Sequence, residues 1–235
     1  MTPSERLQDF LDSGRLIRGA WTGTDAQGRE TACLLAALSP EVAATHNEAD
    51  CPADIMPQWL AYLTPWFDDA GSVEAWPTMK QRFAGLVKRW SVLTATDWRQ
   101  LDYTCRRIAV EEAAQHYNGE KFPMVRAAIG TVIALCCRAE NSDYPSDEEW
   151  EAARATAEAA EASREAKAAW VAKAAWVAIA AAEAADEAAF AAARVAARAA
   201  ARAAGWAAEE AAADRITAAI FDAIEVKIAE AEKRT

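Results

Sequence analysis

The sequence has few of the residues and patterns on which most enzyme active sites are built. It contains two His, and it lacks a glycine-rich phosphate loop, a G-x-S-x-G turn and an H-E-x-x-H pair. Its clustered glycines, at positions 14, 19, 23 and 28, are too widely spaced to cradle a phosphate. We therefore expect a protein that is not an enzyme, with no catalytic residue, no metal ligand and no cofactor. A site made of carboxylates alone would leave little trace in the sequence and stays an alternative.

Cysteine is also sparse, and its spacing excludes a secreted disulfide framework. The five Cys are odd in number and form no C-x-x-C pair, a pattern typical of reduced thiols in the cytosol. The first residues lack the basic and apolar regions of a signal peptide. The longest uncharged run of the alanine-rich half, 174–182, is far shorter than the roughly 20 residues of a membrane span. We expect a cytoplasmic protein with no membrane partner.

Positive charge is in deficit as well. The chain carries 36 acidic residues against 25 Lys and Arg, which gives a formal net charge of −11. Such a balance disfavours direct contact with nucleic-acid phosphates or anionic lipid. If the protein binds electrostatically, we expect its partner to be a basic protein. At 53% hydrophobic residues, the chain has enough apolar side chains for a real core.

What the sequence has in abundance is alanine. Between positions 151 and 213, 36 of 63 residues are Ala, the residue with the highest helix propensity. We predict an all-α protein in two parts: a mixed-core helical domain over 1–145 and an alanine-rich helical region over 146–235. A single helix over 147–233 would be about 130 Å long. It must therefore fold back into a hairpin or bundle, with Gly205 the best break, or the protein is extended and oligomeric.

Helix signals divide the first part into short elements. Thr2 with Glu5, and Ser146 with Glu149, each have the spacing of a capping box. Prolines open helices or interrupt them, as at Pro40 in TACLLAALSPEVAAT, and either Thr94 or Thr96 caps a long helix. Residues 15–30 are the one place where a small β-hairpin is expected, with TDAQG as its turn.

The titratable pairs carry little catalytic signal. His46 lies near Cys51 and Asp50 in the chain and would form a thiol–base pair, but the spacing suggests no third group. Glu112 and His116 stand one helical turn apart without the further ligands that a metal needs. The adjacent acids Asp68–Asp69 and Glu111–Glu112 are typical of a solvated surface.

The start of the alanine-rich region is strongly acidic. Its charges suit a helix N-terminus and a solvated face, or they form a surface for a basic partner, because charges one turn apart can imitate the phosphates of a duplex. The candidate partner-binding residues are Asp147, Glu148, Glu149, Trp150, Glu151, Glu158, Glu161 and Glu165. The last three would alternatively face Arg202, Arg198 and Arg194 across a hairpin that turns near Ala180.

Large side chains on the alanine background indicate packing surfaces. A Trp there fills a seam between helices or sits at a protein interface. Ile residues at strict i, i+4 spacing predict a buried stripe that docks onto the first domain or onto a second subunit. The candidate seam or oligomer residues are Trp170, Trp176, Trp206, Ile216, Ile220, Ile224 and Ile228.

Three runs carry a resemblance: GRETACLLAAL, CPADIMPQWLAYLTPWFDDAG and AARVAARAAARAAGWAAEEAAADRITAAIFDAIE. The chain resembles uncharacterised alanine-rich helical proteins of phage, prophage and bacterial mobile elements, and it is also similar to alanine-rich immunity proteins that neutralise toxins. The resemblance implies an accessory gene whose product inhibits a defence protein or a toxin. The leading hypothesis is an acidic inhibitor of a basic nucleic-acid-binding effector, of the anti-CRISPR type. The alternatives are a self-assembling structural protein and a toxin-immunity protein.

Overall fold

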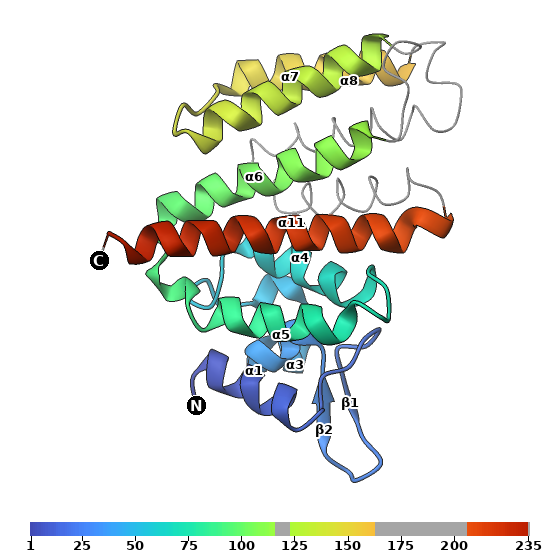
Figure 1. The fold of residues 1–235 in the computed structure, drawn as a ribbon, viewed down its shortest axis with the longest axis vertical. Coiled ribbons are helices and arrows are strands. Elements are labelled where there is room, and N and C mark those ends of the chain that lie inside the picture. The colour runs from blue at the N-terminus through green and yellow to red at the C-terminus, as the bar shows by residue number, and fades with distance from the viewer. Residues whose placement is uncertain (116–122, 163–205, 235) are drawn as a thin grey trace.

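The computed structural model describes residues 1–115, 123–162 and 206–234, and it confirms an all-α protein with one small antiparallel hairpin (Figure 1). The helices are α1 Pro3–Asp12, α2 Leu34–Leu38, α3 Pro40–Thr45, α4 Gln58–Asp69, α5 Trp76–Val87, α6 Ala95–Ala114, α7 Pro123–Glu140, α8 Asp147–Ala162 and α11 Trp206–Glu232. Two 3-10 turns are η1 Glu48–Asp50 and η2 Trp90–Val92, and the strands are β1 Thr22–Thr24 and β2 Glu30–Ala32.

The predicted caps begin the helices. The Thr2 hydroxyl accepts from the Glu5 N–H at 3.2 Å, and the Glu5 carboxylate accepts from the Thr2 N–H at 2.7 Å, which completes a capping box. Ser146 and Glu149 form the same reciprocal pair ahead of α8. Of the two candidates for α6, Thr94 is the cap. These side chains satisfy N–H groups that have no partner inside the helix.

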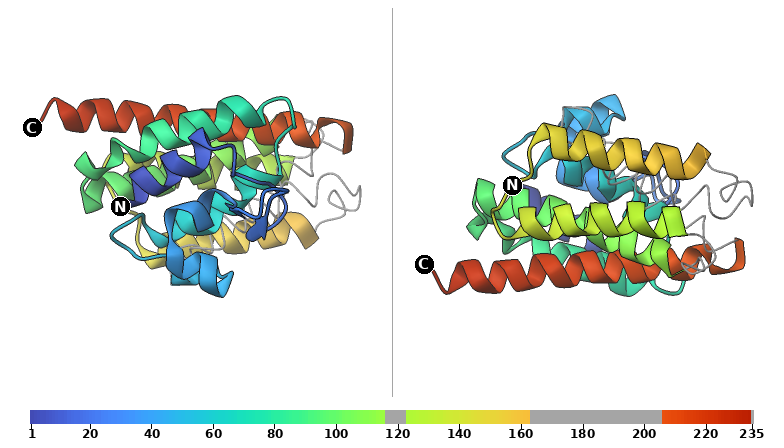
Figure 2. Two further views of the ribbon diagram at one scale, coloured as in Figure 1. Left: turned by 90° about the horizontal axis from the view of Figure 1, so that it is seen from below. Right: turned by 90° about the horizontal axis from the view of Figure 1, so that it is seen from above.

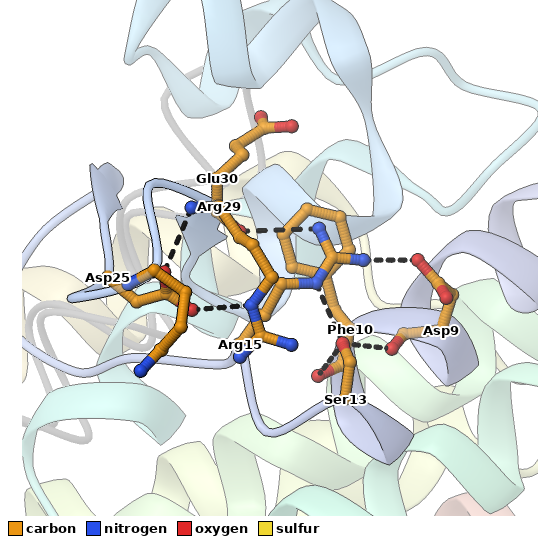
Figure 3. Close-up of polar contacts among 8 residues, drawn as sticks. Asp9, Phe10, Ser13, Arg15, Asp25, Arg29 and Glu30 are labelled. Carbon is orange, nitrogen blue, oxygen red and sulfur yellow. Dashed lines mark hydrogen bonds and ion pairs between the residues drawn. The ribbon is translucent and has the colours of Figure 1, made fainter.

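The predicted hairpin forms, and its turn is closed by local hydrogen bonds. The Asp25 carboxylate accepts from the Arg29 N–H at 2.9 Å, and Gly28 takes the positive φ of 76° that the turn requires. Arg15 ties the hairpin to α1: its guanidinium donates to the Glu30 carbonyl of β2 at 3.3 Å and to Asp9, and it lies 4.1 Å from the Phe10 ring centroid (Figure 3). The hairpin projects from one end of the molecule (Figure 1).

Helix α11 lies between α5 and α6 (Figure 1). The C-terminal helix therefore packs against helices from the N-terminal half of the chain and completes their hydrophobic core. Figure 2 shows the axes of α7, α8 and α11 lying roughly parallel, with the chain in α8 running opposite to that in α7 and α11. Phe221 on α11 stacks edge-on against Phe67 of α4, with ring centroids 5.0 Å apart, and touches Phe83 of α5. One cluster of buried side chains contains residues from both sides of position 145. The described helices of the two compositional regions therefore share one hydrophobic core.

The isoleucine stripe occupies this core. Ile216, Ile220, Ile224 and Ile228 are all buried, and α11 packs on α5 and α6 of the same chain. Intrachain docking, one of the two predicted outcomes, thus accounts for the stripe.

Ion pairs fasten the outer side of α11. Arg82 of α5 contacts Asp222 and Glu225, while Arg215 of α11 donates to the buried Glu112 of α6 at 2.6 Å. Each of these contacts joins two helices, so charged side chains fix how α11 lies on α5 and α6. None of the helices in the described part of the chain combines the length and the hydrophobicity needed to cross a membrane.

Candidate binding pocket

A pocket of about 380 Å³ opens where the hairpin, the start of α2, the end of α3, η1 and the end of α4 come together. Its lining combines acidic, aromatic and thiol side chains from segments far apart in the sequence. The lining residues are Gly19, Ala20, Trp21, Cys33, His46, Glu48, Pro65, Asp68 and Asp69.

Asp68 is the most unusual group of this lining. The residue is 1% exposed, its Oδ2 accepts from the Leu34 N–H at 3.0 Å, and its Oδ1 is buried without a hydrogen-bond partner. Burial raises the pKa of this carboxyl well above its usual range, against the opposing effects of the Leu34 N–H, of Arg18 and of a hydrogen bond with the Cys33 side chain. A buried polar atom without a partner costs free energy, which makes this oxygen a candidate acceptor for a polar ligand.

The wall beside Asp68 is built by backbone hydrogen bonds. Asp69 Oδ1 accepts from the Gly19 N–H at 2.8 Å. Arg18 donates to the carbonyl oxygens of Asp68, Asp69 and Gly71 at the end of α4, where helix carbonyls lack partners within the helix. The Arg18 guanidinium thus bonds to backbone carbonyl groups near the two carboxyls, and its charge lowers the pKa of Asp68 without offsetting the effect of burial.

An aromatic pair, Trp21 and His46, also lines the pocket. The Trp21 and His46 rings are parallel within 6°, with centroids 6.5 Å apart, and His46 Nε2 lies 3.1 Å from the Thr22 hydroxyl. His46 ends α3 in the left-handed conformation, with φ of 57°, and its N–H donates to the Val42 carbonyl. Backbone of this kind is uncommon outside glycine and tends to occur at functional sites. The turn directs the imidazole toward Trp21.

The pocket thiol is poorly suited to nucleophilic attack. Burial together with the Asp68 charge raises the pKa of Cys33 to about 12, and Cys33 caps α2 by accepting from the Ala36 N–H. The pairing of His46 with Cys51 that the sequence suggested is not what the structure assembles. Cys33 is the thiol in the His46 pocket, while Cys51 is buried beside Pro52 with a pKa of about 12.

A metal ion is not favoured here. Over residues 1–115, 123–162 and 206–234, no group of three or more His, Cys, Asp or Glu is arranged to hold one.

Two predictions about adjacent acids were wrong. Asp68 is buried, because the end of α4 turns it inward against the N-terminus of α2. Glu112 is buried as well, and Arg215 compensates its charge across α6 and α11. Its neighbour Glu111 pairs with Arg107 one turn away. Adjacent acids face different directions on a helix, so only one of each pair remained on the surface.

The acidic start of α8 is largely engaged within the protein. Glu149 pairs with Arg138 and completes the Ser146 cap, and Glu151 contacts Arg154. Trp150 is 2% exposed and stacks on Tyr103. Trp150 therefore belongs to the core, which corrects its expected place on a partner-binding surface.

The remaining acids of this predicted surface are only partly described. Asp147, Glu148 and Glu158 are exposed, and the pKa of Glu148 is lowered by hydrogen bonds at the helix start. Glu161 lies in α8 by its backbone, and Trp206 begins α11, but their side chains are outside the described part. Glu165, His116, Trp170, Trp176, Gly205 and the expected Glu–Arg pairs of the hairpin near Ala180 lie outside the described residues.

The distribution of charge carries a signal that would have located the pocket. The 50 residues at positions 30–79 contain eight acids and no Lys or Arg. These acids are Glu30, Glu41, Glu48, Asp50, Asp54, Asp68, Asp69 and Glu74. Three of them line the pocket. Averaging charge over each half of the chain hides this segment.

Known proteins give no guide to the function of this chain. No protein-family model matches the chain, and no curated protein and no solved structure matches it either.

Proposed function

We propose that the protein is a non-enzymatic acidic binding protein that inhibits a basic, nucleic-acid-binding protein by occupying its charged groove. The carrying observation is the base-free acidic segment 30–79, which folds around a pocket containing a buried carboxyl oxygen without a partner. A groove that binds phosphates is rich in Lys and Arg, and an acidic surface complements it. An effector of a defence system against phage is the partner class that we propose.

The way the acids are engaged supports this proposal. Acids on α11 contact Arg side chains of neighbouring helices, and Glu149 and Glu151 of α8 have Arg partners nearby. In the pocket region, by contrast, Asp68 and Asp69 accept from backbone N–H groups, which fix their positions but add no full positive charge. Asp69, held in this way, presents its charge to a partner, whereas Asp68, whose pKa is raised by burial, becomes charged only when it releases its proton.

Affinity capture tests the proposal. The full chain, tagged, is used as bait in nuclease-treated lysate of the source cell, and bound proteins are identified at about 50 mM and about 500 mM salt. We expect a basic nucleic-acid-handling protein to be retained at low salt and weakened at least about tenfold at high salt, because exposed charges are screened. Nucleic-acid binding by that partner should fall when our protein is added. A captured partner whose affinity does not change with salt contradicts the charge-based proposal.

Paired variants locate the surface. The double variant Glu48→Gln, Asp69→Asn removes two pocket charges, while Glu149→Gln, Glu151→Gln removes two charges from α8. We expect the first to weaken capture more than the second, although both change the net charge equally. A greater loss of capture with the α8 variant would indicate that the binding surface lies on α8.

A further inference from the structure

Resting on this proposed function, we infer that the pocket is a receptor for a guanidinium group, supplied by an Arg side chain of the basic partner. Asp68 and Asp69 would accept its N–H groups, and Trp21 would stack on its plane. The inference adds one element to the proposed function, a guanidinium as the group that the pocket binds, and the two can therefore fail separately.

The acceptor geometry favours a ligand with several N–H donors. Asp68 and Asp69 are neighbours at the end of α4, each with one oxygen held by a backbone N–H. The Oδ1 atom of Asp68 is buried and lacks a partner. A guanidinium has five N–H groups in one plane, so it can reach more than one acceptor, whereas an ammonium is a compact point charge.

The aromatic wall favours a planar cation. Trp21 is partly exposed and is held flat against His46, which leaves an indole as one boundary of the pocket. Arginine stacks on aromatic faces through its delocalised charge. The same molecule shows this packing at Arg15, whose guanidinium lies over the Phe10 ring while donating to Asp9 and to the Ser13 hydroxyl (Figure 3).

Binding of a cation should be linked to release of a proton. The pKa of the Asp68 carboxyl is raised by burial, so at low pH the carboxyl is protonated and attracts a cation less. The other titratable or charged groups around it are Arg18, Cys33, His46, Glu48 and Asp69. Affinity should therefore rise with pH, by at most about tenfold per pH unit for one titrating carboxyl.

The experiment compares a charged ligand with a neutral isostere. N-acetyl-arginine methylamide and N-acetyl-citrulline methylamide are titrated into the ¹⁵N-labelled full chain, and the chemical shifts of amides next to the pocket, such as Gly19 and Leu34, are followed. We expect the arginine compound to bind with a millimolar dissociation constant and the citrulline compound to bind at least about tenfold more weakly. Equal binding of the two, or no shift with either, overturns the inference.

Variants distinguish arginine binding in the pocket from attraction by the net negative charge of the protein. Asp68→Asn should weaken arginine binding at least about tenfold, whereas Glu74→Gln, which removes an exposed acid outside the pocket lining, should leave it unchanged. Asp69→Asn provides a second test if Asp68→Asn fails to fold. Equal losses of arginine binding with Asp69→Asn and Glu74→Gln would mean that the ligand is attracted by the general negative charge of the protein. That result would overturn the inference that the pocket binds a guanidinium.

The source of the guanidinium is tested with free L-arginine. Tighter binding of the free amino acid than of the capped one would assign the pocket to a small metabolite and overturn the protein side chain as occupant. Salt-sensitive capture of a basic protein without any binding of the arginine compound would refute the pocket and leave the proposed function standing. Binding of the arginine compound without capture of a basic protein would refute the proposed function and leave the guanidinium pocket standing.

Discussion

Two regions of the molecule use acidic residues in different ways. Along the seam between α5 and α11, acids meet guanidinium groups of the neighbouring helix, as Asp222 and Glu225 do with Arg82. Around the pocket, Asp68 and Asp69 accept from backbone N–H groups, and the nearby Arg18 donates to carbonyl oxygens. The acids of the seam are neutralised within the protein, whereas we propose that the pocket acids receive a cation from a partner. An acidic composition therefore says little about binding until the partners of each acid are known.

The largest expected effect is on the core beneath the seam. Replacing Phe221 by Ala removes a ring that packs on Phe67 and Phe83, so the free energy of unfolding should fall by about 3–5 kcal/mol. Urea denaturation followed by circular dichroism measures this change. Val226→Ala is the matched control on the same helix, because Val226 is 59% exposed and should cost less than about 0.5 kcal/mol. Similar losses for both variants would refute docking of α11 through this face.

The next effect is a pH dependence of stability that comes from the pocket. Burial raises the pKa of Asp68, so between its ordinary pKa of about 4 and the raised value the folded state holds a proton that the unfolded chain loses. Stability from this carboxyl is thus present at low pH and is lost as pH rises, at no more than about 1.4 kcal/mol per pH unit.

Asp68→Asn removes this titration. Urea denaturation at pH 5 and pH 8 should show a smaller decline for the variant than for the original chain, while arginine binding is weakened. A variant whose stability has the same pH dependence as the original would show that Asp68 is ionised in the folded protein.

Thiol reactivity separates a binding pocket from a catalytic one. Burial raises the pKa of Cys33 to about 12, and Cys137 is partly exposed. Iodoacetamide should label Cys137 at least about ten times faster than Cys33 at pH 7.5, read by peptide mass spectrometry. Cys137→Ser, the control, should remove the fast phase. Rapid labelling of Cys33 would instead point to thiol chemistry in the pocket.

The smallest expected effect is that of the ion pairs between α5 and α11 on the free energy of unfolding. Arg82→Gln breaks two contacts with partly exposed acids and should lower the free energy of unfolding by less than about 1 kcal/mol. The difference from the original chain should shrink in about 1 M salt, because exposed ion pairs are screened. A loss above about 2 kcal/mol that salt does not reduce would mean that Arg82 acts mainly through its packing on Phe221.

Much of the local structure could be predicted because its causes are local. Capping boxes at Thr2 and Ser146 involve residues three positions apart, and the hairpin turn is closed within five residues around Asp25. The interruption at Pro40 follows from a missing N–H, with Ser39 ending α2 and capping α3. The isoleucine stripe on α11 could be predicted because helical periodicity places its members on one face of the helix.

The pocket could not be predicted because its members are distant in the chain. Asp68 meets the N–H of Leu34, and His46 stacks on Trp21, contacts that depend on how α2, α3, α4 and the hairpin pack. Trp150 and Glu112 were misplaced for the same reason, since the partner that buries each lies on another helix or a distant turn.

The sequence by itself determined an all-α chain with defined helix starts, one small hairpin, a buried stripe on its last helix and an acidic charge. Propensity, capping and periodicity act over a few residues, so they survive without tertiary contacts. Only the tertiary structure decided which acids are neutralised by Arg and which accept from backbone N–H groups. Electrostatic pairing and burial depend on distance in space, and packing of the helices sets that distance.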